Sequence, residues 1–139
     1  MNVSLELESV HTDVVAPSGA EAGRVDLLEV GGAGRRLHIV MGRAEAKAID
    51  EAFRGLASPR PLPWDLLRSL LEALGGSLGS VVITEVEEGR LFRAEVVVQR
   101  DGEEHRLAAR PSDALALAVR CGCSDLFAAA EVMDRAASP

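Results

Sequence analysis

The sequence predicts an α+β fold in which about four helices pack on a mostly antiparallel sheet. Three observations support this fold class. Two strand-like stretches near the N-terminus flank a glycine-rich turn, three more strand-like stretches follow one another closely in the second half, and a pair of helix-like stretches follows each group. A chain of 139 residues with 47% hydrophobic side chains is long enough for one domain, which we expect to span residues 1–139.

The N-terminal part is predicted to be mainly strands. From Val3 to Leu7 apolar and polar residues alternate, which is the pattern of a half-buried strand. The stretch from His11 to Gly23 contains a Pro-Ser-Gly sequence and is predicted to be a loop. Residues 24–30 and 35–41 have the composition of two hairpin-like strands, because the glycines between them suit a tight turn.

Two helices are predicted to follow. From Glu45 to Phe53, three- and four-residue spacing places Ala46, Ile49 and Phe53 on one face, which we expect to be buried. The second helix starts at Pro63, because proline fits the first helical position and an aspartate two residues later favours the positive end of the helix dipole. It runs to Gly75 with a wide apolar stripe of five leucines, Leu66, Leu67, Leu70, Leu71 and Leu74.

A three-stranded antiparallel meander is predicted over residues 81–87, 91–99 and 105–109. The dipeptides Glu88-Gly89 and Asp101-Gly102 between these strands are typical of two-residue hairpin turns. The stretch from Pro111 to Cys121 is apolar nearly all round, so it is predicted to be a deeply buried helix. Residues 125–127 are predicted to be a short connector, and residues 128–137 a last helix.

Composition limits the class of function. The formal net charge of −7 argues against an extended electrostatic grip on a nucleic-acid backbone. The N-terminus lacks the basic start and apolar block of a signal peptide, and no segment has the ~18 apolar residues of a membrane span. We therefore expect a cytoplasmic protein with no membrane association and with reduced cysteines.

The histidines and cysteines form no recognisable catalytic or metal-binding pattern. None of the three histidines has a serine, cysteine or aspartate at an informative spacing, so each is predicted to lie at the surface or at a strand edge. A zinc site needs four ligands, and Cys121-Gly122-Cys123 has no second cysteine pair to complete one. These thiols are predicted to be structural and to flank a glycine that ends a helix.

Asp65 and Asp113 are the carboxylates of interest, because each follows a helix-starting proline by two residues. In one interpretation each side chain accepts backbone N–H groups in the first turn of its own helix, as in half of a capping box. In the other, both helix starts point into one cleft. The two aspartates then hold a Mg²⁺ or Mn²⁺ ion while Arg60 and Arg110 hold a phosphate, as in metal-assisted phosphodiester hydrolysis.

Several short motifs in a fixed order resemble the bifunctional nuclease domain family, which was long described only as a domain of unknown function. The most specific is the run Arg110-Pro111-Ser112-Asp113-Ala114. Met41-Gly42-Arg43-Ala44-Glu45-Ala46 is similar to the family's start of the first helix, and Pro59-Arg60-Pro61 with Asp65-Leu66-Leu67 is similar to its second conserved segment. The resemblance is strongest over residues 37–131.

The resemblance implies a nuclease that cleaves both DNA and RNA and that often forms a homodimer. The positions that match the family's motifs are Glu45, Asp65, Arg110, Ser112 and Asp113. Two positions differ from the family's pattern. Trp64 stands where the family often has a histidine, and Ala108 where it often has an acidic residue. This chain therefore lacks a possible general base and a possible metal ligand at those positions.

Two functions are therefore predicted. In the first, Asp65 and Asp113 bind the metal ion and activate water, Glu45 orients the water or the metal, and Arg110 stabilises the charge on the phosphate, with Arg60 and Ser112 as further substrate contacts. In the second, the chain is a non-catalytic dimeric binding or regulatory module. Arg110 then pairs with a carboxylate and holds a corner between a strand and a helix.

Overall fold

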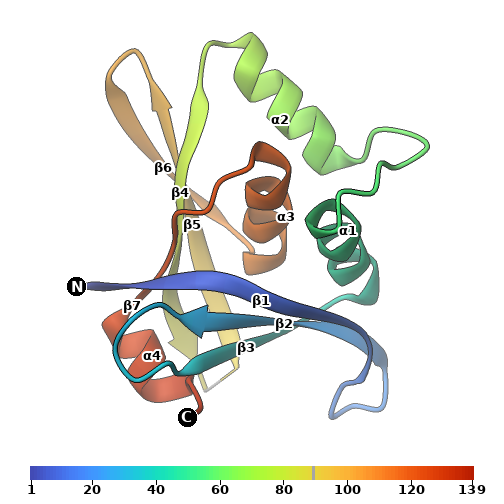
Figure 1. Cartoon of the computed structure of the whole chain (residues 1–139), viewed down its shortest axis with the longest axis vertical. Helices are drawn as coiled ribbons and strands as arrows, with labels where there is room; N and C mark the ends of the chain where they lie inside the picture. The colour runs from blue at the N-terminus through green and yellow to red at the C-terminus, as the bar shows by residue number, and fades with distance from the viewer. Residues whose placement is uncertain (89) are drawn as a thin grey trace.

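One mixed sheet runs through the whole molecule, and the helices pack against it (Figure 1). The structure is a computed structural model that describes residues 1–88 and 90–139. The strands are β1 (Asn2–Val15), β2 (Glu21–Glu29), β3 (Arg36–Met41), β4 (Ser77–Glu87), β5 (Leu91–Arg100), β6 (Glu103–Ala109) and β7 (Leu126–Ala129). The helices are α1 (Arg43–Phe53), α2 (Pro63–Ala73), α3 (Pro111–Cys121) and α4 (Ala130–Ala136). The predicted α+β fold class is confirmed.

The order of strands across the sheet is β3-β2-β1-β7-β4-β5-β6. All neighbours are antiparallel except β4 and β7, which are parallel. The short strand β7 therefore joins an N-terminal three-stranded group to the predicted meander. The Asp101-Gly102 turn of the meander is confirmed by positive φ angles of 52° and 75°, whereas Glu88-Gly89 lies partly outside the described residues.

The structure corrects two predictions at the centre of the sheet. The stretch from His11 to Gly23 is not a loop, because β1 continues to Val15 and pairs with β2 up to Glu21. The β-branched residues there support a long strand, and the Pro-Ser-Gly turn occupies only the tip. Residues 125–127 are not a mere connector but belong largely to β7, and the last helix accordingly begins at Ala130.

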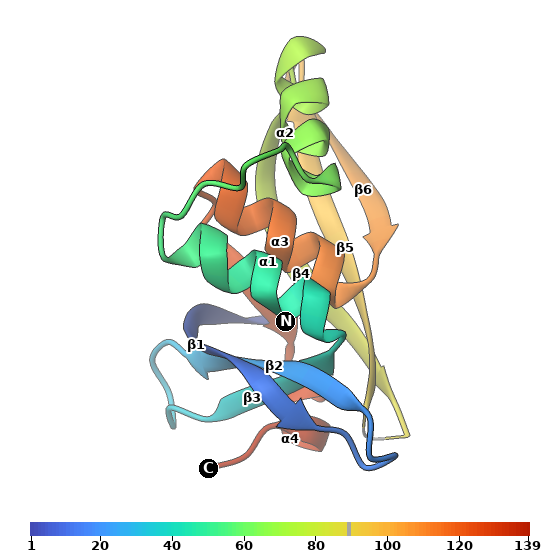
Figure 2. The ribbon, with the colours of Figure 1, turned by 90° about the vertical axis from the view of Figure 1, so that its right-hand side faces the viewer.

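The core lies between the sheet and the helices α1 and α3, which run side by side in Figure 2. The buried character predicted for α3 is confirmed, since all residues from Ala114 to Ala118 are buried. Ala46 and Ile49 of α1 are fully buried as predicted, but Phe53 at its end is 48% exposed. In the described part of the chain, no helix is long and apolar enough to cross a membrane.

The helix α2 does not bury the leucine stripe that the sequence predicts. None of its residues is buried, and it extends away from α1 and α3 toward one end of the molecule (Figure 2). Leu66, Leu67, Leu70 and Leu74 are between 46% and 65% exposed. The predicted apolar face of α2 is therefore present, but the rest of the chain covers little of it.

The close approach of α1 to β2 depends on a glycine. A Cβ atom at Gly23 would collide with the Cβ of Ala46, and it would also lie 3.2 Å from the backbone oxygen of His11. Because neither neighbour is a flexible side chain, we expect Gly23→Ala to lower the free energy of unfolding by about 1–3 kcal/mol. Chemical denaturation measures the change.

Gly79→Ala is the matched control for this substitution. The three atoms nearest to its Cβ would all belong to the flexible side chain of Gln99, with Nε2 the closest at 3.0 Å. A loss of stability at Gly79 as large as that at Gly23 would show that backbone crowding is not the cause.

Candidate functional site

The two proline-led helix starts have the predicted geometry. Leu62 precedes α2 and Arg110 precedes α3, and both residues are extended, with ψ angles of 166° and 145°. Pro63 and Pro111 therefore occupy first-turn positions, where the missing N–H costs nothing. The side chains of Trp64 and Asp113 connect the two starts, because Trp64 Nε1 donates a hydrogen bond of 3.0 Å to Asp113 Oδ1.

Asp113 is held by a fork from Arg110. Arg110 Nε donates to Oδ2 at 2.8 Å and Nη2 donates to Oδ1 at 3.0 Å. The hydrogen bonds from Arg110, together with the weaker contribution of Trp64, keep the pKa of the Asp113 carboxyl below its usual value against the opposing effect of burial. Asp113 is therefore an ionised acceptor that fixes the orientation of Arg110, whose side chain is 65% exposed.

Asp65 is held by two different donors. Its Oδ2 accepts the backbone N–H of Leu62 at 2.7 Å, which is the predicted half of a capping box, and its Oδ1 accepts Arg120 Nε at 3.0 Å. Arg120 is almost buried and also donates to the carbonyl oxygens of Ala116 and Ala48. Asp65 is therefore part of a junction that ties α1, α2 and α3 together.

Glu45 and Ser112 complete the set of predicted residues. The carboxylate of Glu45 folds back over Gly42 at the start of α1, where an added Cβ would lie 2.5 Å from Oε2. The pKa of Arg110 is raised first by Asp113 and to a smaller extent by the negative charge of Glu45, so Glu45 belongs to the same neighbourhood. Ser112 is only 6% exposed and lies in the first turn of α3, directed away from solvent.

Asp65 and Asp113 open onto different hollows. Asp65 lines a polar hollow of about 380 Å³ together with Arg60, Arg68 and Arg120. Asp113 lines an apolar groove of about 330 Å³ that lies between the leucines of α2 and the strands β5 and β6. The structure thus pairs Asp113 with Arg110, whose guanidinium also feels the charge of Glu45, and it places Asp65 with Arg60 at the other hollow.

The family model described as "Bifunctional nuclease domain" matches residues 27–139, which include every one of these side chains. The chain belongs to the bifunctional nuclease domain family.

Two uncharacterized proteins of Mycobacterium tuberculosis are similar to this member of the family, one from strain CDC 1551 / Oshkosh and one from strain H37Rv. Each is 42% identical over 96 residues, which cover 69% of this chain and 56% of the relative. The chain therefore spans only a little more than half the length of the curated relatives that it matches.

The carboxylates of this bifunctional nuclease domain do not fit a divalent cation in the arrangement seen here. The oxygens of Asp65 face the N–H groups of Leu62 and Arg120, and those of Asp113 face Arg110 and Trp64. Among residues 1–88 and 90–139, no group of three or more His, Cys, Asp or Glu side chains is placed to hold a metal ion. A Mg²⁺ or Mn²⁺ ion between Asp65 and Asp113 stays a prediction, and the geometry lends it no support.

Sequence reasoning missed the two side chains that connect the site. Trp64 is the single tryptophan, and the sequence marks it only as a departure from the family's pattern. In the structure its ring N–H connects α2 to Asp113, and the guanidinium of Arg120 lies over the ring with Cζ 5.4 Å from the centroid. Arg120 directly follows the apolar run from Ala114 to Val119 in α3. A charge at the end of a buried apolar run is a signal that could have marked it as a paired side chain.

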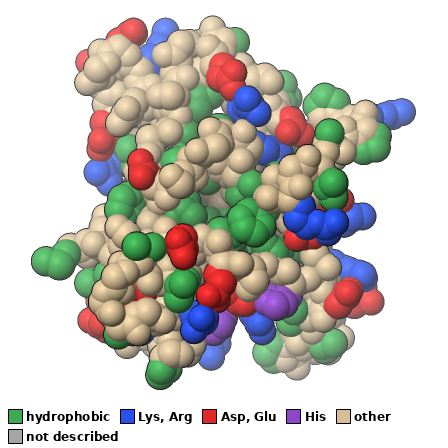
Figure 3. Space-filling view, in the orientation of Figure 1, with side chains coloured by type: hydrophobic (Ala, Val, Ile, Leu, Met, Phe, Trp, Pro, Cys, Tyr) green, Lys and Arg blue, Asp and Glu red, His purple; other side chains and the backbone are tan. Residues whose placement is uncertain are grey.

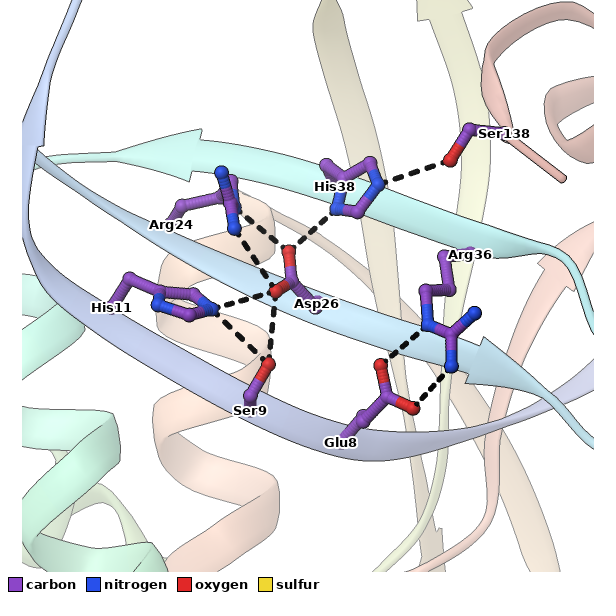
Figure 4. Close-up of polar contacts among 8 residues, drawn as sticks. All are labelled: Glu8, Ser9, His11, Arg24, Asp26, Arg36, His38 and Ser138. Atoms are coloured by element: carbon purple, nitrogen blue, oxygen red, sulfur yellow. Dashed lines mark hydrogen bonds and ion pairs between the residues drawn. The ribbon is translucent and has the colours of Figure 1, made fainter.

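A second polar cluster lies on the outer face of β1, β2 and β3, around Asp26 (Figure 4). Asp26 is 5% exposed and accepts hydrogen bonds from His38, Arg24, Ser9 and His11. His11 and His38 therefore share an acidic partner that their spacing in the sequence does not indicate. The residues are distant in sequence, and only the pairing of three strands places them together.

Asp26, His38 and Ser138 follow the hydrogen-bond order of a Ser-His-Asp relay, with 2.6 Å from Oδ1 to Nδ1 and 3.0 Å from Nε2 to Oγ. Arg24 forks onto the same carboxylate, however, and its charge opposes the imidazolium that such a relay must stabilise. The backbone of Ser138 is also bonded in both directions to Arg36. These three residues therefore have a structural role, which is to fix the segment at Ser138 to β3.

The two cysteines have the properties of structural thiols. Burial raises the pKa of both Cys121 and Cys123, which lowers the fraction of reactive thiolate. Gly122 between them has a φ of 66° and ends α3 in the left-handed conformation, as predicted for a helix-ending glycine.

Proposed function

We propose that this chain is a nuclease that cleaves phosphodiester bonds of DNA and RNA at the corner formed by Arg110, Asp113 and Glu45. The observation that carries the proposal is the match of residues 27–139 to the bifunctional nuclease domain. The geometry supports it, because an ionised carboxylate holds an exposed arginine, and the negative charge of Glu45 acts on the same guanidinium.

Arg110 is the residue that contacts the substrate in this proposal. A guanidinium has five N–H donors, and two of those on Arg110 are occupied by Asp113. The others can bind a non-bridging phosphate oxygen and stabilise the negative charge that develops during cleavage. Asp113 and Trp64 act through Arg110 by fixing its direction, and Glu45 orients the attacking water.

Arg60 supplies a second phosphate contact at the polar hollow beside Asp65. Within the described parts of the chain Arg60 makes no ion pair, and it is exposed. Basic and acidic side chains are interspersed over the face shown in Figure 3, rather than gathered into one positive field. Together with the net charge of −7, this favours contact with a short stretch of backbone over a long electrostatic track.

A cleavage assay on single- and double-stranded DNA and RNA tests this function. We expect Arg110→Ala to lower the cleavage rate by about 10²–10³-fold, the usual loss when one charge-stabilising donor is removed. Asp113→Asn should also lower the rate, because it releases the fork. The matched control is Arg135→Ala, which removes an exposed arginine of α4 that pairs with Glu131 one turn earlier on the same helix.

The same assay with Mn²⁺ and with a chelator decides whether a metal is needed. Cleavage that persists in chelator would contradict the predicted metal dependence and leave the role of Arg110 intact. Equal rates for the wild-type chain, Arg110→Ala and Arg135→Ala would contradict the proposed site.

A non-catalytic binding module is the second candidate, and one observation favours it. Hydrogen-bond donors of this chain already occupy the carboxylates of Asp65 and Asp113, and the two side chains line different hollows. In that case the Arg110–Asp113 fork only holds the corner between β6 and α3. No cleavage by the wild-type protein under any metal condition, with a lower melting temperature for Arg110→Ala, would support the module.

A further inference from the structure

The polar hollow of the candidate site contains three arginine side chains. Residues of α1, α2, α3 and the segment between α1 and α2 line its volume of about 380 Å³. Arg60 comes from that segment, Arg68 from α2 and Arg120 from α3. We call this space the arginine hollow. Arg110 and Asp113 do not line it, so it is a second place where an anion can bind.

The carboxylates of the arginine hollow do not use up its positive charge. Asp65 accepts the backbone N–H at its own helix start and the Nε of Arg120, so its charge is balanced inside the chain. Glu51 lies 3.9 Å from the ammonium of Lys47. Arg60 is exposed, and over residues 1–88 and 90–139 it makes no ion pair. Its guanidinium is therefore available to an anion in the hollow.

Two of the three arginines are held in place before any ligand binds. The guanidinium of Arg120 donates hydrogen bonds to α1, α2 and α3 and lies over the ring of Trp64. Arg60 stands between Pro59 and Pro61, and the two proline rings restrict its backbone to extended conformations. An anion that binds here therefore costs little conformational entropy of the protein.

We infer that the arginine hollow binds the terminal phosphate of a nucleic-acid strand. The choice of a nucleic acid as the ligand rests on the nuclease function proposed above. A terminal phosphate carries a charge of about −1.5 to −2 at pH 7 and has three free oxygens, whereas a phosphate within the strand carries one charge. Arginine binds phosphate oxygens through pairs of N–H groups, so several guanidiniums around one hollow favour the terminal group.

One side chain connects the arginine hollow to the proposed cleavage site. The ring N–H of Trp64 donates to Asp113 at 3.0 Å, and Cζ of Arg120 lies 5.4 Å from the centroid of the same ring. A strand whose end is bound beside Arg120 therefore reaches Arg110 within a few nucleotides. The bound end then selects the bond that is cleaved, and cleavage releases short fragments of one length.

Titration of the full chain with short DNA strands tests the inference. The strands share one sequence and carry a 5′-phosphate, a 3′-phosphate or neither, and their phosphorothioate linkages keep the charge and resist cleavage. Trp64 reports binding by its fluorescence, because the chain has one tryptophan and no tyrosine, and calorimetry gives the affinity. We expect at least one phosphorylated strand to bind about 10- to 100-fold more tightly than the strand with two hydroxyl ends. Equal affinities for all three strands would overturn the inference.

Arginine variants assign the preference to the hollow. Arg60→Ala should reduce the preference for the phosphorylated strand about 10-fold, and Arg60→Ala/Arg68→Ala should abolish it. Both side chains are exposed, so circular dichroism should show the fold unchanged. Arg54→Ala is the matched control, because Arg54 is 61% exposed and pairs with Asp50 but does not line the hollow. A preference that survives in the double variant would overturn the inference.

Two further ligands distinguish a strand end from other phosphates. Inorganic phosphate and a phosphoserine peptide should both bind more weakly than the phosphorylated strand, and either one binding as tightly would overturn the assignment to a nucleic acid. The titration and the cleavage assay fail separately. Cleavage by a protein that does not distinguish the strand ends would overturn the role of the hollow alone. A preference for phosphorylated ends without any cleavage would support the hollow and contradict the nuclease.

Discussion

Asp26→Asn should lower the free energy of unfolding by about 2–4 kcal/mol, because a buried carboxylate that accepts hydrogen bonds from four side chains loses its charge. Asp26 is 5% exposed, and Arg24 forks onto it with distances of 2.9 and 3.3 Å. An asparagine of the same shape leaves this guanidinium without its counter-charge. The substitution also removes the negative charge that His11 of β1 and His38 of β3 contact, so the side-chain contacts that join β1, β2 and β3 are weakened.

The loss should depend on pH. Burial alone would raise the pKa of Asp26, but hydrogen bonds from His38, Arg24, Ser9 and His11 outweigh it and bring the pKa far below the usual range. Below the ordinary aspartate value of about 3.9, the unfolded chain binds a proton that the folded chain does not. The stabilisation is therefore present above about pH 4 and is lost as the pH falls further.

Urea denaturation at a series of pH values measures this difference. The difference in the free energy of unfolding between the wild-type protein and Asp26→Asn should be largest near pH 7 and should shrink as the pH falls below about 4. Asp13→Asn is the control, because Asp13 lies on the same sheet and pairs with Arg43 but is 83% exposed, so its loss should cost little. If this difference in stability did not change with pH, the ionised carboxylate of Asp26 would not be its cause.

The general fold could be predicted because its signals are local. The proline at the start of α3 and the alternation in β5 specify their elements within about ten residues, and both are found as predicted. The strand β7 could not be found in this way. Its four residues pair with β1 and β4 from distant parts of the chain, so tertiary pairing and not local pattern makes them a strand.

The candidate site was predicted only in part, for a similar reason. The capping role of Asp65 follows from its position two residues after Pro63, and the sequence identifies it. Which second donor reaches Asp65 depends on how α2 crosses α3, and nothing in the spacing of Asp65 and Arg120 indicates that contact. The leucine stripe of α2 was also identified correctly, but the sequence does not indicate that most of it is exposed on this chain.

Arg120→Met should lower the free energy of unfolding by about 2–4 kcal/mol, because it removes a buried guanidinium that donates to Asp65 and to two backbone carbonyl oxygens. The side chain of Arg120 is 7% exposed and makes contacts to α1, α2 and α3, including the ring of Trp64. Methionine keeps the length and the apolar stem but has no donors. The charge on Asp65 and the carbonyl oxygens of Ala48 and Ala116 would then lack their buried partner.

A double-mutant cycle with Asp65→Asn isolates the pair, and denaturation of the four proteins gives the coupling. We expect the double variant to be less destabilised than the sum of the single ones, because the neutral asparagine no longer needs the guanidinium. Arg68→Met is the control, since Arg68 is 51% exposed and pairs with Glu72 on the same helix. If Arg68→Met lowered the free energy of unfolding as much as Arg120→Met, the contacts of Arg120 with α1, α2 and α3 would not explain its effect.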